Sequence, residues 1–154
     1  MQNDNEIHES GETTVTLNPT EEAATLNSLA HDINAWAEEK GFNEDYDDAD
    51  WLEDLVRNLN LNGDAGARLV QVADRHREMA TTKNLMLMVS ELSEALEAQR
   101  DGESDPEHTV AVELADTMIR ILHLAGTLRL PIGDLLIKKM DKNAKRPRKH
   151  GRRF

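Results

Sequence analysis

The chain contains no cysteine and few aromatic residues. Without cysteine it can form no disulfide framework and perform no thiol chemistry. Aromatic residues make up 3% of the 154 residues while all hydrophobic types make up 38%, so the core must consist mainly of Leu, Val, Ile, Met and Ala. That mixture favours helices. A chain of this length is expected to form one domain.

Long hydrophobic runs are also missing. No uninterrupted apolar stretch reaches the length that a membrane span requires. The N-terminal sequence MQNDNEIHES lacks a basic start followed by an apolar segment, so no secretory signal is predicted. We therefore expect a soluble, cytoplasmic protein without a membrane partner.

Charge is abundant but unevenly distributed. The chain has 30 acidic and 18 basic residues, for a formal net charge of -12. The last seventeen positions reverse this balance, because nine Lys or Arg residues there stand against the single acid Asp141. Such a basic end suits nucleic acid, the phosphate groups of a small ligand or an acidic protein surface. Charge alone leaves these alternatives open.

Apolar residues at helical spacing predict several helical segments around a central one. The outer segments run from Asn18-Pro19 to Gly41, from Asp50 to Asn62-Gly63, over 64–79, and from Pro131 onward. The polar and acidic residues 1–17 predict a mobile arm. Residues 147–154 predict an extended basic tail.

The central segment, Lys83–Arg120, carries two carboxylate pairs. Glu91 and Glu94 form the first pair, and Glu113 and Asp116 form the second. Within each pair the spacing of three residues places both carboxylates on one face of a helix. The stretches 94–100 and 107–113 have equal length on either side of the turn DGESDP. An antiparallel helical hairpin would therefore bring all four carboxylates face to face.

Four opposed carboxylates need a positive partner. Two like charges about 4 Å apart repel by roughly 4 kcal/mol at an effective dielectric constant of 20. Either protons or a cation must compensate. All four groups are hard oxygen ligands and no His or Cys is expected among them, so Mg²⁺ is the preferred ion, with Mn²⁺ able to substitute. A solvated acidic face remains the alternative, because the same spacing occurs elsewhere, as in Glu6 and Glu9.

Two residues outside the pairs are further candidates. His123 lies seven residues after Asp116, on the same helical face, where a lone His is more often a packed residue than a ligand. Trp36 lies beside the apolar stripe of the first helix, and a place in the core is favoured over an interface or a base contact.

The motifs ELSE at 91–94 and ELAD at 113–116, with eighteen residues between them, carry a resemblance to a known family. They are similar to the E-x-x-E and E-x-x-D pattern of the all-α nucleotide pyrophosphohydrolases of the MazG-like type, which are related to dimeric dUTPases and dCTP pyrophosphatases. Lys83-Asn84 and the closing KKMDKNAKRPRKHGRRF fit the same pattern. The resemblance covers about 22–45 and 79–154, and 46–78 looks like an insertion.

The chain departs from that family at two positions. Many relatives have a further Glu where this chain has Ser90. Many also place an aromatic residue where this chain has Arg148. Base stacking from that second position is therefore not expected here.

The resemblance implies a single all-α domain over 18–154 with a four-helix-bundle-like core. It implies an enzyme that cleaves a nucleoside triphosphate between its α and β phosphates, giving a monophosphate and pyrophosphate. Glu91, Glu94, Glu113 and Asp116 would be the catalytic residues and Mg²⁺ ligands. The substrate-binding residues would be Lys83, Asn84, Lys139, Asn143 and Arg146. A homodimer or homotetramer is implied, and nucleic acid is an unlikely partner.

A different class of protein is also compatible with the sequence. A non-catalytic helical module would use the basic C-terminal tail to bind nucleic acid, or would act as an adaptor. Binding to nucleic acid should weaken steeply with salt and survive EDTA, whereas the enzyme should require a divalent ion.

Overall fold

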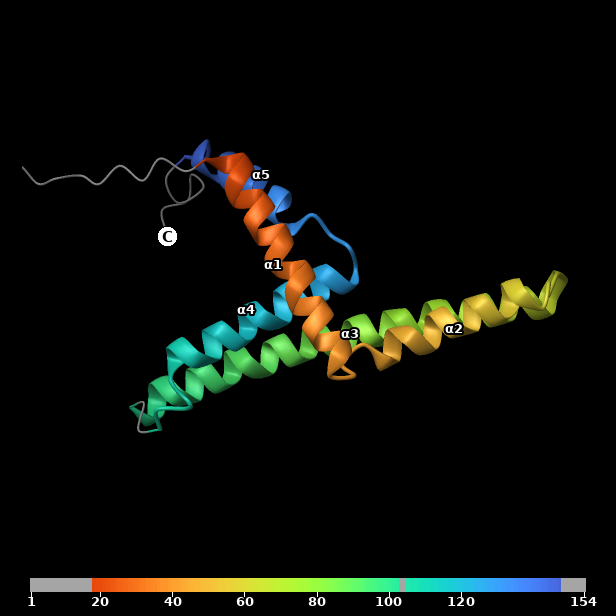
Figure 1. The fold of residues 1–154 in the computed structure, drawn as a ribbon. Coiled ribbons are helices and arrows are strands. Elements are labelled where there is room, and N and C mark those ends of the chain that lie inside the picture. The colour runs from red at the N-terminus through yellow and green to blue at the C-terminus, as the bar shows by residue number, and fades with distance from the viewer. Residues whose placement is uncertain (1–17, 103–104, 148–154) are drawn as a thin grey trace, which may run out of the picture.

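The structure is a computed structural model that describes residues 18–102 and 105–147, and this part of the chain is all-α (Figure 1). The predicted fold class is thereby confirmed. The helices are α1 (Pro19–Glu39), α2 (Glu44–Asn58), α3 (Gly63–Asp101), α4 (Val110–Thr127) and α5 (Ile132–Ala144). The arm predicted over 1–17 and the tail beyond Pro147 lie outside the described residues. Among the described helices, none combines the length and apolar character that a bilayer crossing needs.

Helix α3 is the long axis on which the other elements are arranged (Figure 1). It unites two stretches for which the sequence predicted separate runs, 64–79 and the segment starting at Lys83. The intervening residues contain neither Gly nor Pro, so nothing interrupts the backbone hydrogen bonds. The helix ends at Gly102, whose φ of 73° is the left-handed conformation that closes many helices.

Helix α2 packs antiparallel on the first half of α3 and forms an arm with it (Figure 1). The guanidinium of Arg77 donates to Glu53 Oε1 at 2.5 Å and to Asp50 Oδ1 at 2.7 Å, and it lowers the pKa of the Glu53 carboxyl. This arm covers most of the segment interpreted as an insertion. Helix α2 begins at Glu44 rather than at the predicted Asp50. Acidic residues in its first turn stabilise this earlier start, because negative charge is favourable at a helix N-terminus.

Helix α4 packs on the second half of α3, and α1 packs against both α4 and α5. The approach of α1 is close because small residues line the contact. Ala23, Ala30 and Ala37, each seven residues apart, are the buried residues of α1. A Cβ at Gly126 would lie 2.4 Å from Ala30 O, and one at Gly133 would lie 2.2 Å from Ala23 O. Only glycine permits these approaches.

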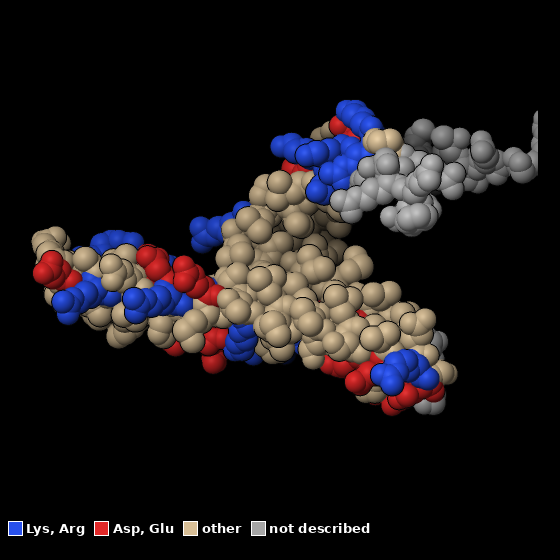
Figure 2. Space-filling model, turned by 180° about the vertical axis from the view of Figure 1, so that it is seen from behind, with Lys and Arg blue, Asp and Glu red and all other residues tan. Residues whose placement is uncertain are grey.

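Large apolar side chains stay exposed along the α3–α4 pair. Figure 2 shows a broad central area with few charged side chains where the helices meet, whereas charges cover the arm. The exposed apolar residues at helical spacing are Leu85, Val89, Leu92 and Leu96 on α3 and Leu114, Met118 and Ile121 on α4. Exposed apolar side chains that gather on one surface are typical of interaction sites.

Candidate metal centre

The carboxylates of the two predicted pairs meet between α3 and α4. Glu91, Glu113 and Asp116 each offer an oxygen within 4.8 Å of the others. Glu94 and Glu113 form a second group of the same size together with His108. The antiparallel hairpin expected from the sequence is thus confirmed, but its four carboxylates divide between two groups that share Glu113. Their role as metal ligands stays a prediction.

The ends of the hairpin fix this meeting. Gly102 terminates α3 one residue after Asp101, and α4 begins after Thr109. The Thr109 side chain accepts a hydrogen bond from Val112 N at 3.3 Å, which satisfies one of the free amides at the helix start. The helical arms differ in length, because Glu94 lies seven residues before the end of α3 and Glu113 lies three residues after the start of α4. Packing of α4 on α3 nevertheless brings Glu113 beside Glu94.

The two groups combine buried and accessible carboxylates. Glu91 is 6% exposed and Glu113 is 2% exposed, whereas Glu94 and Asp116 are more accessible. A buried carboxylate is costly without a charged or hydrogen-bonding partner. Arg120 supplies one, because its Nε donates to Glu91 Oε1 at 2.5 Å. Arg120 was not among the residues predicted for the site.

The expectation that no His belongs to the cluster is wrong. His108 Nδ1 lies 3.1 Å from Glu113 Oε1. The hydrogen bond to Glu113 is the main reason that the pKa of His108 is raised above its usual value. His108 precedes the cap residue Thr109 and therefore lies outside the helical periodicity that placed the carboxylates.

A cavity of about 380 Å³ opens beside Glu91 and Asp116. Lys83 and Asn84, predicted as substrate-binding residues, both line it. Lys83 Nζ donates to Asp45 Oδ2 at 2.5 Å, and the buried Asn84 donates from Nδ2 to Ala80 O at 3.0 Å. Arg120 lines the same cavity. Acidic groups and cations thus share one hollow.

Two aromatic residues, Trp36 on α1 and Phe42 in the turn after it, also line the cavity. The Trp36 and Phe42 rings lie 6.1 Å apart between centroids with planes tilted by 42°. Trp36 is 51% exposed and Phe42 is 59% exposed, so the core position favoured for Trp36 is not the one that it occupies. Exposed aromatic faces beside a polar cavity are suited to stacking against a planar ligand.

His123 lines the cavity and is part of a polar network. Its Nε2 donates to Asn43 Oδ1 at 2.7 Å, and Asn43 Nδ2 donates to Asn34 Oδ1 at 3.1 Å. Thr127 Oγ1 donates to the same Asn34 oxygen at 2.7 Å. Burial lowers the pKa of His123, which favours a neutral ring. The network ties the end of α1 to α4 and so holds the aromatic pair beside the carboxylates.

The remaining predicted substrate-binding residues lie elsewhere in the chain. Lys139 and Asn143 are on α5 and Arg146 follows it, and none of them lines the cavity. The start of α5 is fixed to the N-terminal half of α1, where Gly133 N donates to Asn27 Oδ1 at 2.8 Å. Figure 1 shows α5 beside α1, apart from the α3–α4 hairpin.

The donor set fits a divalent cation. Three carboxylate oxygens within 4.8 Å of one another, two of them from buried side chains, match the hard oxygen ligands that Mg²⁺ and Mn²⁺ prefer.

No family model, curated protein or solved structure matches the chain.

Proposed function

We propose that this protein is a divalent-metal-dependent nucleoside triphosphate pyrophosphohydrolase of the MazG-like type. The observation that carries the proposal is the pair of ligand groups that share the buried Glu113. Two adjoining cation positions are the arrangement that many enzymes use on phosphate esters and anhydrides. The proposed substrate is a soluble nucleotide, which fits a cytoplasmic enzyme.

The cavity has the parts that a nucleotide would need. Lys83 and Arg120 offer cationic groups to phosphate oxygens, and Asn84 offers an amide to the sugar, base or phosphate. Trp36 and Phe42 offer aromatic faces for the base. These groups line the same hollow as Glu91 and Asp116, so one ligand can reach all of them.

In the proposed reaction a water molecule attacks the α-phosphorus, and the bond from this phosphorus to the bridging oxygen of the β-phosphate breaks. Pyrophosphate leaves, and a carboxylate of the cluster accepts the proton of the water. Bound Mg²⁺, or Mn²⁺ in its place, would supply charge neutralisation and a more acidic water. Glu91, Glu94, Glu113 and Asp116 would hold it. Arg120, released from Glu91, would pair with the phosphates, and the two aromatic rings would orient the base.

We also propose that the working form is a homodimer or homotetramer. The α3–α4 pair is two helices thick and leaves an apolar stripe on each helix uncovered. A second copy would cover these stripes and complete a four-helix core across a symmetric interface. In a single chain Lys139, Asn143 and Arg146 do not line the cavity, so a phosphate-binding role for them would require the partner copy.

Release of pyrophosphate from a panel of ribo- and deoxyribonucleoside triphosphates tests the proposal. The wild type should release pyrophosphate with Mg²⁺ or Mn²⁺ and lose this activity with EDTA. Glu94→Gln and Asp116→Asn should each reduce turnover by at least about 100-fold, since even a lost outer-shell partner of a metal can cost 10- to 100-fold. Glu78→Gln, at an exposed position of α3, is the matched control and should retain full activity.

Absence of turnover across the panel, or unchanged turnover in both variants, would contradict the enzymatic proposal. In that event the non-catalytic alternative gains weight. A gel-shift titration would then distinguish it, because nucleic-acid binding through the lysines of α5 should survive EDTA and weaken with salt.

A further inference from the structure

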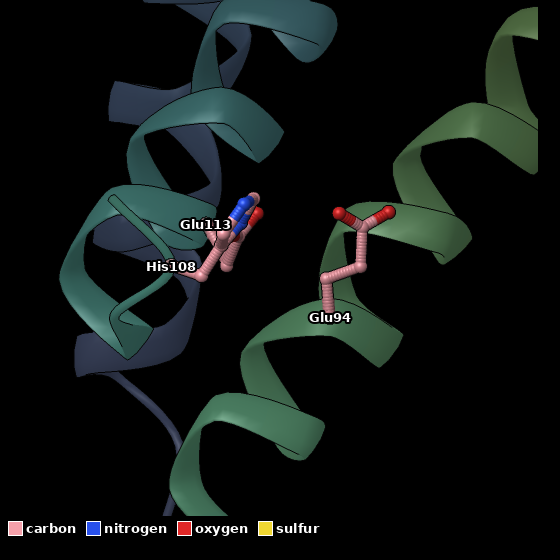
Figure 3. A group of neighbouring side chains, drawn as sticks. All are labelled: Glu94, His108 and Glu113. Atoms are coloured by element: carbon pink, nitrogen blue, oxygen red, sulfur yellow. The ribbon is translucent and has the colours of Figure 1, made fainter. Parts of the chain in front are cut away.

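The group formed by Glu94, His108 and Glu113 differs chemically from the all-carboxylate group beside it. Figure 3 shows the Glu94 side chain projecting from α3 toward Glu113 on α4, with His108 directly beside Glu113. One ligand atom from each residue lies within 4.8 Å of the others. This cluster therefore offers one imidazole nitrogen and two carboxylates to the same point.

The three side chains are held in place by neighbouring contacts. Ser90 Oγ donates to Glu94 Oε1 at 3.1 Å. His108 N donates to Asp105 O at 3.1 Å, and the residue after His108 is the cap of α4. Glu113 is nearly fully buried in the hairpin. The side chains thus converge before any ion is bound, which reduces the entropy lost on binding.

The surroundings favour a cation at this point. A hollow of about 290 Å³ is lined by the three residues and also by Glu97, Asp101 and Asp105. Five carboxylates thus face one imidazole around an opening to solvent. The negative potential of this opening would draw in divalent ions and exclude anions.

The mixed donor set determines which ion suits the group. Imidazole is a frequent ligand of first-row transition metal ions, whereas Mg²⁺ binds mainly oxygen and keeps several waters. A site with one nitrogen and two carboxylates should therefore favour Mn²⁺, Co²⁺ or Zn²⁺ over Mg²⁺. The neighbouring group with Glu91 and Asp116 has oxygen donors only and lacks this preference.

We infer that Glu94, His108 and Glu113 form a second metal position that is selective for a first-row transition metal ion. The inference rests on the proposed function in that both place cations between α3 and α4. It adds a ligand, His108, and a metal preference that the motifs do not contain. The competing interpretation is that His108 and Glu113 form an ion pair only.

Metal binding to the full-length, metal-stripped protein tests the inference without nucleotide. Co²⁺ is the probe, because its visible absorption reports nitrogen ligation, and Mg²⁺ is titrated separately by calorimetry. His108→Ala should weaken Co²⁺ binding by at least about 10-fold, the smallest loss expected when a metal site loses even an outer-shell partner. Its affinity for Mg²⁺ should change by less than about 2-fold. His31→Ala, at a position with an 83% exposed side chain on α1, is the control and should leave both affinities unchanged.

Equal Co²⁺ affinity in the wild type and His108→Ala would overturn the second position and leave an ion pair only. An equal loss in His108→Ala and His31→Ala would overturn it too, since Co²⁺ would then bind surface histidines. Pyrophosphate release by the wild type with Mg²⁺, measured on the same preparations, separates the two proposals. If the wild type turns over nucleotide and His108→Ala binds Co²⁺ as the wild type does, only the second metal position is contradicted. If His108→Ala alone loses Co²⁺ affinity and the wild type shows no turnover, the second position is supported and the pyrophosphohydrolase proposal is contradicted.

Discussion

At the scale of single residues, the most informative contact joins Arg120 to Glu91. The Nε–Oε1 distance is 2.5 Å, and the carboxylate side is nearly buried. The guanidinium therefore compensates the negative charge of the Glu91 carboxylate, which would otherwise be buried without a partner. It does so at the point where a divalent ion is proposed to bind, so the two cations compete for the same carboxylate.

Replacing Arg120 by Met should expose this competition. The metal-free variant should be less stable by about 2 kcal/mol, below the loss for a fully buried pair because the Arg120 side chain is 37% exposed. Addition of Mg²⁺ should raise its melting temperature by more than it raises that of the wild type. Thermal unfolding with and without Mg²⁺ measures both effects. Arg120→Lys retains a cation and should resemble the wild type.

An equal or smaller Mg²⁺ effect in Arg120→Met would show that Glu91 does not take part in cation binding. A lower melting temperature alone would then reflect only the lost ion pair.

The sequence contained part of the signal for these residues. Arg120 lies four residues after Asp116 and seven after Glu113, so helical periodicity alone places it on the ligand face. The carboxylate pairs were predictable for the same reason. His108 was not, because it precedes the helix and its direction depends on the turn and on the cap at Thr109. Periodicity carries no information about such residues.

At the scale of helices, the close packing of α1 on α4 determines the position of Trp36 and Phe42. Gly126 faces the backbone of α1, and a Cβ there would lie 2.4 Å from Ala30 O and 2.6 Å from Asn34 Cβ. These neighbours cannot move without displacing α1, because one is backbone and the other belongs to the polar network with Asn43. Close packing of α1 thus depends on the missing side chain.

Gly126→Ala should destabilise the fold by about 2 kcal/mol. Overpacking of this kind costs about 1–3 kcal/mol. Helix propensity acts in the opposite direction, since Ala is favoured over Gly by about 1 kcal/mol inside a helix. The sign of the change in the free energy of unfolding, measured by denaturant titration, therefore distinguishes the two effects.

Ala111→Gly, at an exposed position in the first turn of the same helix, is the control and should cost at most about 1 kcal/mol, the propensity difference of a helix interior. A stabilised Gly126→Ala variant would contradict the close approach of α1 and α4.

Element lengths explain what the sequence could and could not predict at this scale. The Gly- and Pro-containing turn between the two carboxylate pairs predicted the hairpin correctly. The equal helical arms 94–100 and 107–113 were wrong, because α4 begins only at Val110. The union of two runs into α3 was missed because the polar residues 81–84 resembled an interruption. No Gly or Pro lies between Gly66 and Gly102, so the helix continues through them. The position of α5 depends on Gly133 meeting Ala23, a contact between residues far apart in sequence that no local pattern encodes.

At the scale of the whole molecule, the chain buries little large apolar surface. The buried hydrophobic residues are mostly alanines, while Leu and Met side chains of α3 and α4 remain open. Composition predicted a core of Leu, Val, Ile, Met and Ala, and in the described chain alanine occupies most of that core. The larger side chains thus remain available for the proposed second copy.

Glu substitutions on the two exposed stripes test this assembly. Val89→Glu and Met118→Glu should each shift the protein from dimer or tetramer toward monomer, because a charge in an apolar interface is desolvated without a partner. Sedimentation velocity measures the shift. Leu59→Glu, an equally exposed position at the tip of the arm, is the control and should leave the assembly unchanged.

A wild type that sediments as a monomer would contradict the proposed assembly. So would a Leu59→Glu variant that dissociates to the same degree as the stripe variants.

The continuity of α3 couples two parts of the molecule that the sequence treated as separate. An α-helix turns by about 100° with each residue. The register in which α3 packs on α2 therefore sets the direction in which Glu91 and Glu94 project from α3. Losing one residue near the middle of α3 would swing those carboxylates about 100° around the axis while the arm stayed in place. Because one continuous helix runs through both, a rotation of α3 in the arm would rotate its ligands in the hairpin by the same angle.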